Sequence, residues 1–357
     1  MKNTKALLEF WEEQMRHSHR SSNYFFRKSP SHYHMMLLVM SAYKQEQKIS
    51  VEELKTYLFK TSRPKSALII NEACEKGFFF LEKNSEDSRK KRFIERLHSI
   101  LGEENVISHP DDLLVYEYDG SVDQSIPEVV ALPSSTDQVS QILALAHQER
   151  VPVAGRGSGT GLSGGAIAPP GGMQVVFTKM NHILNIDTEN HTATVEPGVI
   201  NLDLDNQARK LGMRYAPDPS SQKACSLGGN IAENAGGPHC LAYGTTTNHV
   251  LAMEVVLENG SIVQIGGPSR FVPGYDLRGA FIGSEGTFGI ATEITVRLLP
   301  LPELVKTFLG VFPDIESACS AVSAIIGHGI VPAALEMIDS TTIKAVQSVM
   351  DAGYPED

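Results

Sequence analysis

The stretch GRGSGTGLSGGA, residues 155–166, decides the fold of most of this chain. It places six glycines among twelve residues and contains the pattern G-x-G-x-x-G at Gly159, Gly161 and Gly164. In a Rossmann NAD site, that pattern is followed at once by a helix and, about 20 residues later, by an acidic ribose ligand. Here GAIAPPGGMQVVF follows the loop, the next segment ends in TKMN without a carboxylate, and no Walker A lysine is present. We therefore interpret the loop as a cradle of backbone N–H groups for an anion, with Arg156 as countercharge, and not as an NAD or ATP site.

The residues before this loop predict a β-α-β unit. PEVVALP (127–133) is typical of a strand, SSTDQVSQILALAHQER (134–150) of an amphipathic helix, and VPVAGRG (151–157) of a second strand. Val139, Ile142, Leu143 and Ala146 share one face of the predicted helix. The glycine-rich loop therefore begins where a strand ends.

A second glycine cluster follows in residues 215–260, and a third in GSEGTFGIATEITVRLLP (283–300). Glycines and small or amide side chains dominate LGGNIAENAGGPHC within the second cluster. Such stretches supply too little side-chain bulk for a core, and they allow a long, flat cofactor to lie against backbone. A cofactor that contains a diphosphate fits these features together.

Composition sets the broad class of protein. The chain has 357 residues, is 41% hydrophobic and carries a formal net charge of −11, which indicates two or three globular domains. No apolar run reaches the roughly 18 residues that a membrane span needs, and the charged N-terminus is unlike a signal peptide, so we expect a cytoplasmic protein. Four scattered cysteines without a CxxC pair argue against a disulfide framework, a zinc ribbon or an iron–sulfur run in this chain. We predict no metal site within it.

The charge is unevenly distributed. Residues 1–92 hold 18 Lys and Arg against 11 Asp and Glu, a net charge of +7, whereas the remainder has a net charge of −18. This asymmetry indicates two parts with different partners. Within the basic part, helical patterns precede TSRPKSALIINEACEKGFF, where Ser62 could cap a helix that stops at Gly77. FFFLEKNSEDSRKKRF (78–93) then reads as a hairpin with a basic tip.

This order of helices and hairpin resembles the winged helix of MarR-type transcriptional regulators, and Asp87-x-Arg89 matches the wing signature of that family. The resemblance implies a recognition helix over residues 62–74 and DNA contacts from Arg63, Lys65, Arg89 and Lys90. The C-terminal dimerisation helix of that family is missing or replaced by IERLHSILG. The alternative is a small packing domain with a solvated basic tip.

From about residue 95 onward, the chain resembles the FAD-linked D-2-hydroxy-acid dehydrogenases, whose FAD module is of the vanillyl-alcohol oxidase type. PVAGRGSGTGLSGGA, PDPSS, LGGNIAENAGG, YGTTTNHV and GSEGTFGI occur in the order of that family. The resemblance implies non-covalent FAD, because Thr160 and Ser163 stand where relatives with covalent flavin use a histidine. The implied cofactor-binding residues are Arg156, Gly157, Ser158, Gly159, Thr160, Gly161, Ser163, Pro217, Asp218, Ser220, Gly228, Gly229, Asn230, Asn234, Gly237, Thr245, Val250, Glu285, Gly286 and Ile290.

The expected architecture is α+β. A winged-helix segment (1–92) precedes an FAD-binding domain of two subdomains (93–300) and the beginning of a truncated, ferredoxin-like substrate domain (301–357), in which we expect a strand, a helix and a strand. The resemblance implies oxidation of a D-2-hydroxy acid of the glycolate or D-lactate type by hydride transfer to flavin. It also implies flavin and iron–sulfur partner subunits or a quinone as electron acceptor.

Catalytic groups are not identified by the sequence, because the family's histidines and acidic residue lie in a region beyond residue 357, where a divalent metal would also bind. Arg278 is a weak candidate for the substrate carboxylate, and a structural ion pair explains it equally well. His239, His249 and His328 are expected to be structural or exposed. The alternatives for the whole chain are a flavin-responsive DNA-binding regulator and an inactive FAD-binding fragment or fusion.

Overall fold

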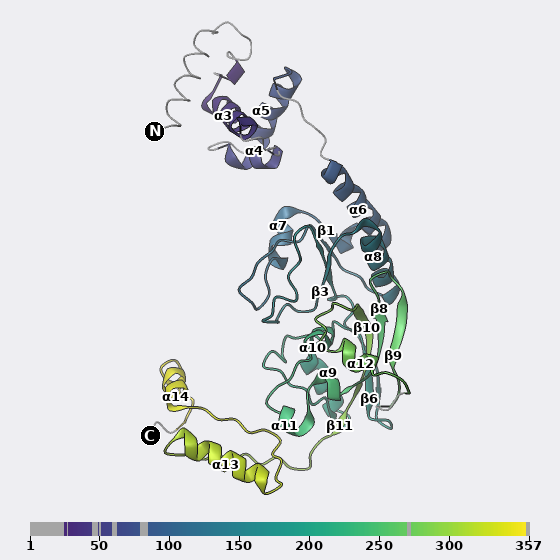
Figure 1. Ribbon diagram of the computed structural model, residues 1–357, viewed down its shortest axis with the longest axis vertical. Coiled ribbons are helices and arrows are strands. Elements are labelled where there is room, and N and C mark those ends of the chain that lie inside the picture. Colours follow the sequence, from purple (N-terminus) through teal and green to yellow (C-terminus); the bar gives the residue numbers. More distant parts are fainter. Residues whose placement is uncertain are drawn as a thin grey trace. The chain divides into compact units, whose positions relative to one another are not determined.

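A computed structural model describes residues 25–26, 28–44, 49, 51–58, 63–78, 85–269 and 273–354 (Figure 1). The chain divides into two compact units, Met1–Ser88 and Arg89–Asp357, and each is described by itself. Among the described residues, no helix combines the length and the apolar character that crossing a membrane requires.

The described residues of the first unit include three helices with defined bounds. They are α3 (Pro30–Lys44), α4 (Val51–Tyr57) and α5 (Arg63–Glu75). Their buried side chains form one cluster that includes Phe25, Met35, Leu58, Ile70 and Ala73. The expected helix after residue 62 is confirmed as α5. Its last residue is Glu75, and Gly77 follows as the predicted stop: the φ of +70° at Gly77 allows the N–H of Phe78 to donate to the Ala73 carbonyl at 3.0 Å.

The predicted basic hairpin is wrong for residues 85–93, because these residues belong to α6 (Ser85–Leu101). Residues 79–84 lie outside the described part. Phe93, Leu97 and Leu101 recur at every fourth position, and all three are buried in the core of the second unit. An apolar stripe at this spacing stabilises a helix once it packs against a partner surface. IERLHSILG is therefore the second half of a helix that begins within the expected wing.

The basic residues of the expected wing tip lie on α6. Arg89 Nε is 3.7 Å from Glu149 Oε2, and Lys90 forms an ion pair with Glu128. Lys65 is exposed on α5, and the side chain of Arg63 lies outside the described part. Arg89 and Lys90 are thus on a helix and not on a DNA-binding wing.

The second unit begins with a four-stranded sheet in the order β1-β2-β4-β3. Its strands are β1 (Val106–Ile107), β2 (Val129–Ala131), β3 (Val153–Arg156) and β4 (Met173–Val176). β2, β4 and β3 are parallel, and β1 pairs antiparallel with β2. The helix α8 (Thr136–Glu149) connects β2 to β3, which confirms the predicted β-α-β unit, although β4 lies between these two strands.

Each face of the four-stranded sheet packs against its own cluster of apolar side chains. Val129 and Ala131 join α6 and α8 in one buried cluster, whereas Val130 packs with Leu113 of α7 (Pro110–Leu113) in another. This follows from the alternation of side chains along a strand. Figure 1 shows α6 beside α8, in agreement with their shared cluster.

A second, antiparallel sheet follows in the order β5-β6-β10-β8-β9. Its strands are β5 (Ile183–Asp187), β6 (Thr192–Val195), β8 (Val250–Val256), β9 (Ile262–Gly266) and β10 (Ile290–Arg297). The helices α9 (Asn201–Arg209), α10 (Leu227–Glu233) and α12 (Leu277–Phe281) contribute buried side chains to its core. Shorter elements complete this part: β7 (Met213–Arg214) pairs with β11 (Leu299–Pro300), and α11 (Cys240–Tyr243) precedes the 3-10 turn η3 (Thr246–Asn248).

Residues 301–354 contain α13 (Ile315–Gly327) and α14 (Ser340–Gln347) but no strand. The expectation of strands on both sides of α13 is therefore wrong for this segment. A strand needs a neighbouring edge to satisfy its N–H and C=O groups, and no residue of 301–354 pairs with another strand. Large apolar side chains stay exposed here, including Phe308 at 86%.

Candidate functional site

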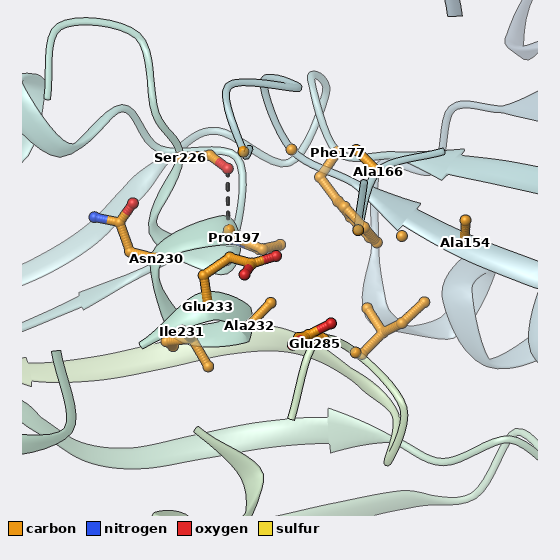
Figure 2. A pocket seen from close by; sticks show the side chains of 18 of the residues that line it. Ala154, Ala166, Phe177, Pro197, Ser226, Asn230, Ile231, Ala232, Glu233 and Glu285 are labelled. Carbon is orange, nitrogen blue, oxygen red and sulfur yellow. Dashed lines mark hydrogen bonds between the residues drawn. The ribbon is translucent and has the colours of Figure 1, made fainter. Parts of the chain in front are cut away.

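A cavity of about 380 Å³ lies in the second unit where three segments meet. They are the loop after β3, the helix α10, and the loop between α12 and β10 (Figure 2). Each of the three predicted glycine clusters contributes to it. The predicted cofactor residues that line it are Gly157, Ser158, Gly159, Thr160, Gly161, Gly228, Gly229, Asn230, Glu285, Gly286 and Ile290.

The loop after β3 contains no helix, as expected from its prolines and glycines. The chain runs through turns from Gly157 to β4. This arrangement differs from a Rossmann loop, whose diphosphate rests on a helix that begins within the loop itself. It agrees with the rejection of an NAD site here.

Gly157 touches the start of α10. A Cβ on Gly157 would lie 2.0 Å from Ser226 Oγ. Ser226 is the N-cap of α10, and its Oγ accepts a hydrogen bond from the N–H of Gly229 at 3.3 Å. The absence of a side chain at position 157 thus allows the loop and the helix to form adjoining walls of one cavity.

Gly159 lies directly against the side chain of Arg156. It has a φ of +67°, and a Cβ there would lie 2.5 Å from Arg156 Nη2. Both the left-handed backbone and the close guanidinium favour glycine. The loop conformation therefore depends on Arg156 as well as on its glycines.

The guanidinium of Arg156 has partners within the protein. Nη1 donates to the Tyr118 carbonyl at 2.8 Å, and Cζ lies 5.9 Å from the centre of the Tyr116 ring. Burial lowers the pKa of Arg156, while the nearby charge of Asp119 raises it. Arg156 is 8% exposed and does not line the cavity. The predicted countercharge thus lies beside the loop.

The loop before β10 is attached to the other end of α10. The N–H groups of Gly283 and Glu285 donate to the carbonyls of Ile231 and Ala232, each at 2.8 Å. Glu285 has a φ of +54°, which is uncommon for a residue with a side chain. Backbone hydrogen bonds thus hold Glu285 in this conformation at the cavity wall.

Nine predicted cofactor residues do not line the cavity. They are Arg156, Ser163, Pro217, Asp218, Ser220, Asn234, Gly237, Thr245 and Val250. Several hold neighbouring turns: Asn234 Oδ1 accepts from the N–H and hydroxyl of Thr247 at 3.0 and 2.9 Å. A Cβ on Gly237 would lie 2.0 Å from the Asp218 carbonyl oxygen. These residues shape the segments around the cavity.

Other lining residues were not predicted from the sequence. They include Ala154, Gly165, Ala166, Phe177, Pro197, Ser221, Cys225, Ser226, Ile231, Ala232, Glu233 and Thr287. Most are small or apolar and look like ordinary core positions. The quoted motifs nevertheless contain Ala154, Gly165, Ala166, Ser221, Ile231, Ala232, Glu233 and Thr287, whereas Phe177, Pro197, Cys225 and Ser226 lie outside them.

Arg278 does not line the cavity. Its Nη1 donates to the Val250 carbonyl at 3.2 Å, and its Nε lies 3.6 Å from Asp276 Oδ1. These contacts support the structural alternative for this arginine. Among the described residues, no group of three or more His, Cys, Asp or Glu side chains is arranged to hold a metal ion.

The three histidines considered from the sequence all have structural partners. His239 Nδ1 lies 2.5 Å from Asp218 Oδ2, and His249 Nε2 lies 2.9 Å from the Tyr243 carbonyl oxygen. His328 Nδ1 lies 2.7 Å from the Ala324 carbonyl oxygen at the end of α13.

Comparison with known families agrees with this geometry. Residues 127–266 match the FAD binding domain, and residues 301–357 match the C-terminal domain of FAD linked oxidases. The protein is therefore a flavoprotein whose cofactor is FAD. More particularly, the second match makes residues 301–357 similar to the C-terminal domain of FAD linked oxidases.

Curated relatives support the same placement. The glycolate oxidase subunit GlcD of Bacillus subtilis is 46% identical over 263 residues, which are 73% of this chain and 56% of that protein. GlcD of Escherichia coli K12 is also 46% identical, over 70% of this chain and 51% of its own length. A D-lactate dehydrogenase of Anaerostipes hadrus is 37% identical, over 65% of this chain and 49% of its own. The chain thus spans about half the length of the curated relatives it matches.

Solved structures show the same fold. An alkyldihydroxyacetonephosphate synthase superposes with a TM-score of 0.65 at 21% identity, over 74% of this chain and 50% of that one. A p-cresol methylhydroxylase superposes with a TM-score of 0.59 at 25% identity, over 67% and 48%. The two-sheet arrangement is therefore shared by enzymes with different substrates.

Proposed function

We propose that this chain binds FAD non-covalently in the cavity and acts in the oxidation of a small D-2-hydroxy acid. The observation that carries the proposal is the wall formed by Gly157, Gly159, Gly161, Gly228 and Gly229. A Cβ on Gly157, Gly159 or Gly228 would lie 2.0, 2.5 or 2.8 Å from a neighbouring protein atom, so the wall can form only with glycine at these positions. Glycine also exposes backbone N–H groups, which could bind a diphosphate.

The cavity fits a dinucleotide that extends over several segments. Its lining is apolar along β3 and Phe177, rich in backbone around the glycine loop, and polar at Ser226, Glu233 and Glu285. Ligand sites commonly combine a mostly apolar wall with a few placed polar groups. The glycine loop and the first turn of α10 would hold the diphosphate.

Bound FAD supplies a hydride acceptor for the reaction. The described residues hold and orient the cofactor, and Arg156 fixes the loop from outside the cavity. Glycolate and D-lactate are the two substrates we propose, on the strength of the GlcD and D-lactate dehydrogenase relatives. Because two relatives are named as subunits, we also propose assembly with further subunits. The comparisons favour this oxidoreductase over the DNA-binding regulator.

Purified full chain tests the proposal in two stages. FAD binding is measured by visible flavin absorbance and by quenching of flavin fluorescence during titration. Anaerobic addition of glycolate or D-lactate should then bleach the flavin absorbance, with L-lactate as the control. A chain that takes up no FAD contradicts the cofactor site, whereas FAD binding without bleaching by either substrate contradicts the activity.

A further inference from the structure

Glu233 brings a carboxylate into the cavity. It is the last residue of α10, and Figure 2 shows its side chain projecting from the helix among the lining residues. Its Oε2 accepts a hydrogen bond from Ser163 Oγ at 3.0 Å. A Cβ on Gly165 would lie 2.7 Å from Oε1, so the absence of a side chain at position 165 leaves room for the carboxylate.

The lining contains no lysine, arginine or histidine among the described residues, so no cation of the wall pairs with Glu233. Glu285 is the other charged residue of the wall and carries the same sign. An ionised carboxylate only accepts hydrogen bonds, and Glu233 accepts one from the hydroxyl of Ser163. A ligand hydroxyl is the chemical equivalent of that partner.

Glu233 lies at the end of α10 opposite to Ser226. Ser226 caps the N-terminal end, Glu233 is the last residue, and seven residues of helix correspond to about 10 Å. The carboxylate faces the later part of the glycine loop, where its Oε1 lies 4.0 Å from a Cβ on Gly161. Because like charges repel, we place the diphosphate at the Gly157–Ser226 end and a neutral part of the cofactor beside the carboxylate. FAD carries hydroxyls on both sides of its diphosphate, in the ribityl chain and in the ribose of adenosine.

We propose that Glu233 binds a sugar-type hydroxyl of FAD and that this hydroxyl takes the place of Ser163 Oγ. The inference rests on the proposed FAD site and adds a specificity-determining residue to it. Ser163 does not line the cavity, so its hydroxyl reaches Glu233 from outside the lining.

The first test compares FAD dissociation constants for Glu233→Ala, Glu233→Gln and Ser163→Ala. A hydrogen bond to a charged acceptor is about twice as strong as a neutral one. We therefore expect affinity to fall about 10-fold in Glu233→Ala, equivalent to about 1.4 kcal/mol, and about 3-fold in Glu233→Gln. Ser163→Ala removes the hydroxyl that FAD must displace, so this variant should bind FAD more tightly and not less. Glu258→Ala, in the exposed turn between β8 and β9, is the matched control.

Two partial ligands identify the hydroxyl. ADP contains the ribose and the diphosphate, whereas FMN contains the ribityl chain. If Glu233 binds the ribose, Glu233→Ala should lower the affinity for ADP and leave the affinity for FMN unchanged. If Glu233 binds the ribityl chain, the variant should lower the affinity for FMN and leave that for ADP unchanged. Unchanged or tighter FAD binding in Glu233→Ala overturns the inference, as does an equal loss in Ser163→Ala, which would assign the pair to loop positioning. Failure of the unmodified chain to bind FAD would instead overturn the proposed function.

Discussion

Gly157 and Ser226 join the two sheet-containing halves of the second unit. A Cβ on Gly157 would lie 2.0 Å from Ser226 Oγ, and that oxygen caps the first turn of α10. Gly157 follows a strand of the four-stranded sheet, whereas α10 packs in the core of the antiparallel sheet. The contact therefore places the glycine loop and α10 on either side of the cavity.

Gly157→Ala should disrupt this contact. The added methyl group must displace Ser226, so we expect FAD affinity to fall at least about 10-fold and the free energy of unfolding to fall by about 1–3 kcal/mol, the usual cost of overpacking. Fluorescence titration with FAD and urea denaturation measure the two effects. An alanine variant with unchanged FAD affinity would contradict the role of this contact.

Gly161→Ala should weaken FAD binding without changing the stability of the folded chain. A Cβ at position 161 meets only Glu233 Oε1, at 4.0 Å, although Gly161 lines the cavity. We expect an unfolding free energy within about 0.5 kcal/mol of the unmodified chain, as for substitutions that disturb no packing. FAD affinity should nevertheless fall several-fold, because the methyl group occupies cofactor space. Equal FAD affinity would show that the cofactor does not approach this glycine.

We expect Arg156 to support FAD binding through the contacts of its planar guanidinium, and not through its positive charge alone. Lysine keeps the charge but cannot reproduce the planar guanidinium that contacts Tyr118 and Tyr116. We expect Arg156→Lys and Arg156→Gln to weaken FAD binding to a similar extent, about 10-fold. Titrations at low and high salt should show the same ionic-strength dependence as the unmodified chain. Full affinity in the lysine variant would indicate instead that the positive charge is what the diphosphate requires.

Asp205 is expected to be important for stability. It is 4% exposed, and its Oδ1 accepts from the N–H of the buried Tyr215 at 2.9 Å, while Oδ2 accepts from Arg209 Nε at 2.6 Å. Asp205→Ala leaves that N–H without its partner, so we expect a loss of about 1–3 kcal/mol in urea denaturation. Arg209→Ala should cost less than about 1 kcal/mol, because that arginine is half exposed. Equal losses of unfolding free energy in the two variants would contradict the larger contribution that we assign to the hydrogen bond between Asp205 and the N–H of Tyr215.

Glu293 should make stability depend on pH. Burial raises its pKa, and the charges of Glu254 and Glu196 raise it further. The ionised form is therefore disfavoured in the folded chain, a cost that is absent below the pKa of the unfolded chain, grows as pH rises above that value, and is complete above the raised pKa of the folded chain. Glu293→Gln should thus raise the melting temperature at neutral pH and give no gain below the ordinary carboxyl range. A gain of equal size at both pH values would exclude titration of Glu293 as its cause.

Much of the FAD domain could be predicted from local sequence. The β-α-β unit appears in the apolar run of β2 and the apolar face of α8, and Gly77 follows the end of α5 as the sequence predicts. Eleven of the cofactor residues expected from the glycine motifs line the cavity. These features are local, because backbone shape and exposure at a glycine depend mainly on the absence of a side chain.

The failures have a common physical cause. Residues 85–93 resemble a hairpin when read alone, but Phe93 and Leu97 bury their side chains only when the segment is a helix. The expected strands beyond residue 300 lack a partner edge within residues 301–354. In both cases the outcome depends on contacts between distant segments, which override local preference.

The sequence by itself argued against a Rossmann NAD site and predicted a glycine-rich backbone cradle for a diphosphate cofactor, and its resemblance to FAD-linked dehydrogenases implied FAD. The tertiary structure decided which groups meet at the cavity. It placed Arg156 beside the loop, against Tyr118, and it brought the carboxylate of Glu233 to Ser163, 70 positions away in the chain. The physical reason is that glycine spacing is encoded along the chain, whereas the direction of a charged side chain depends on partners supplied by other segments.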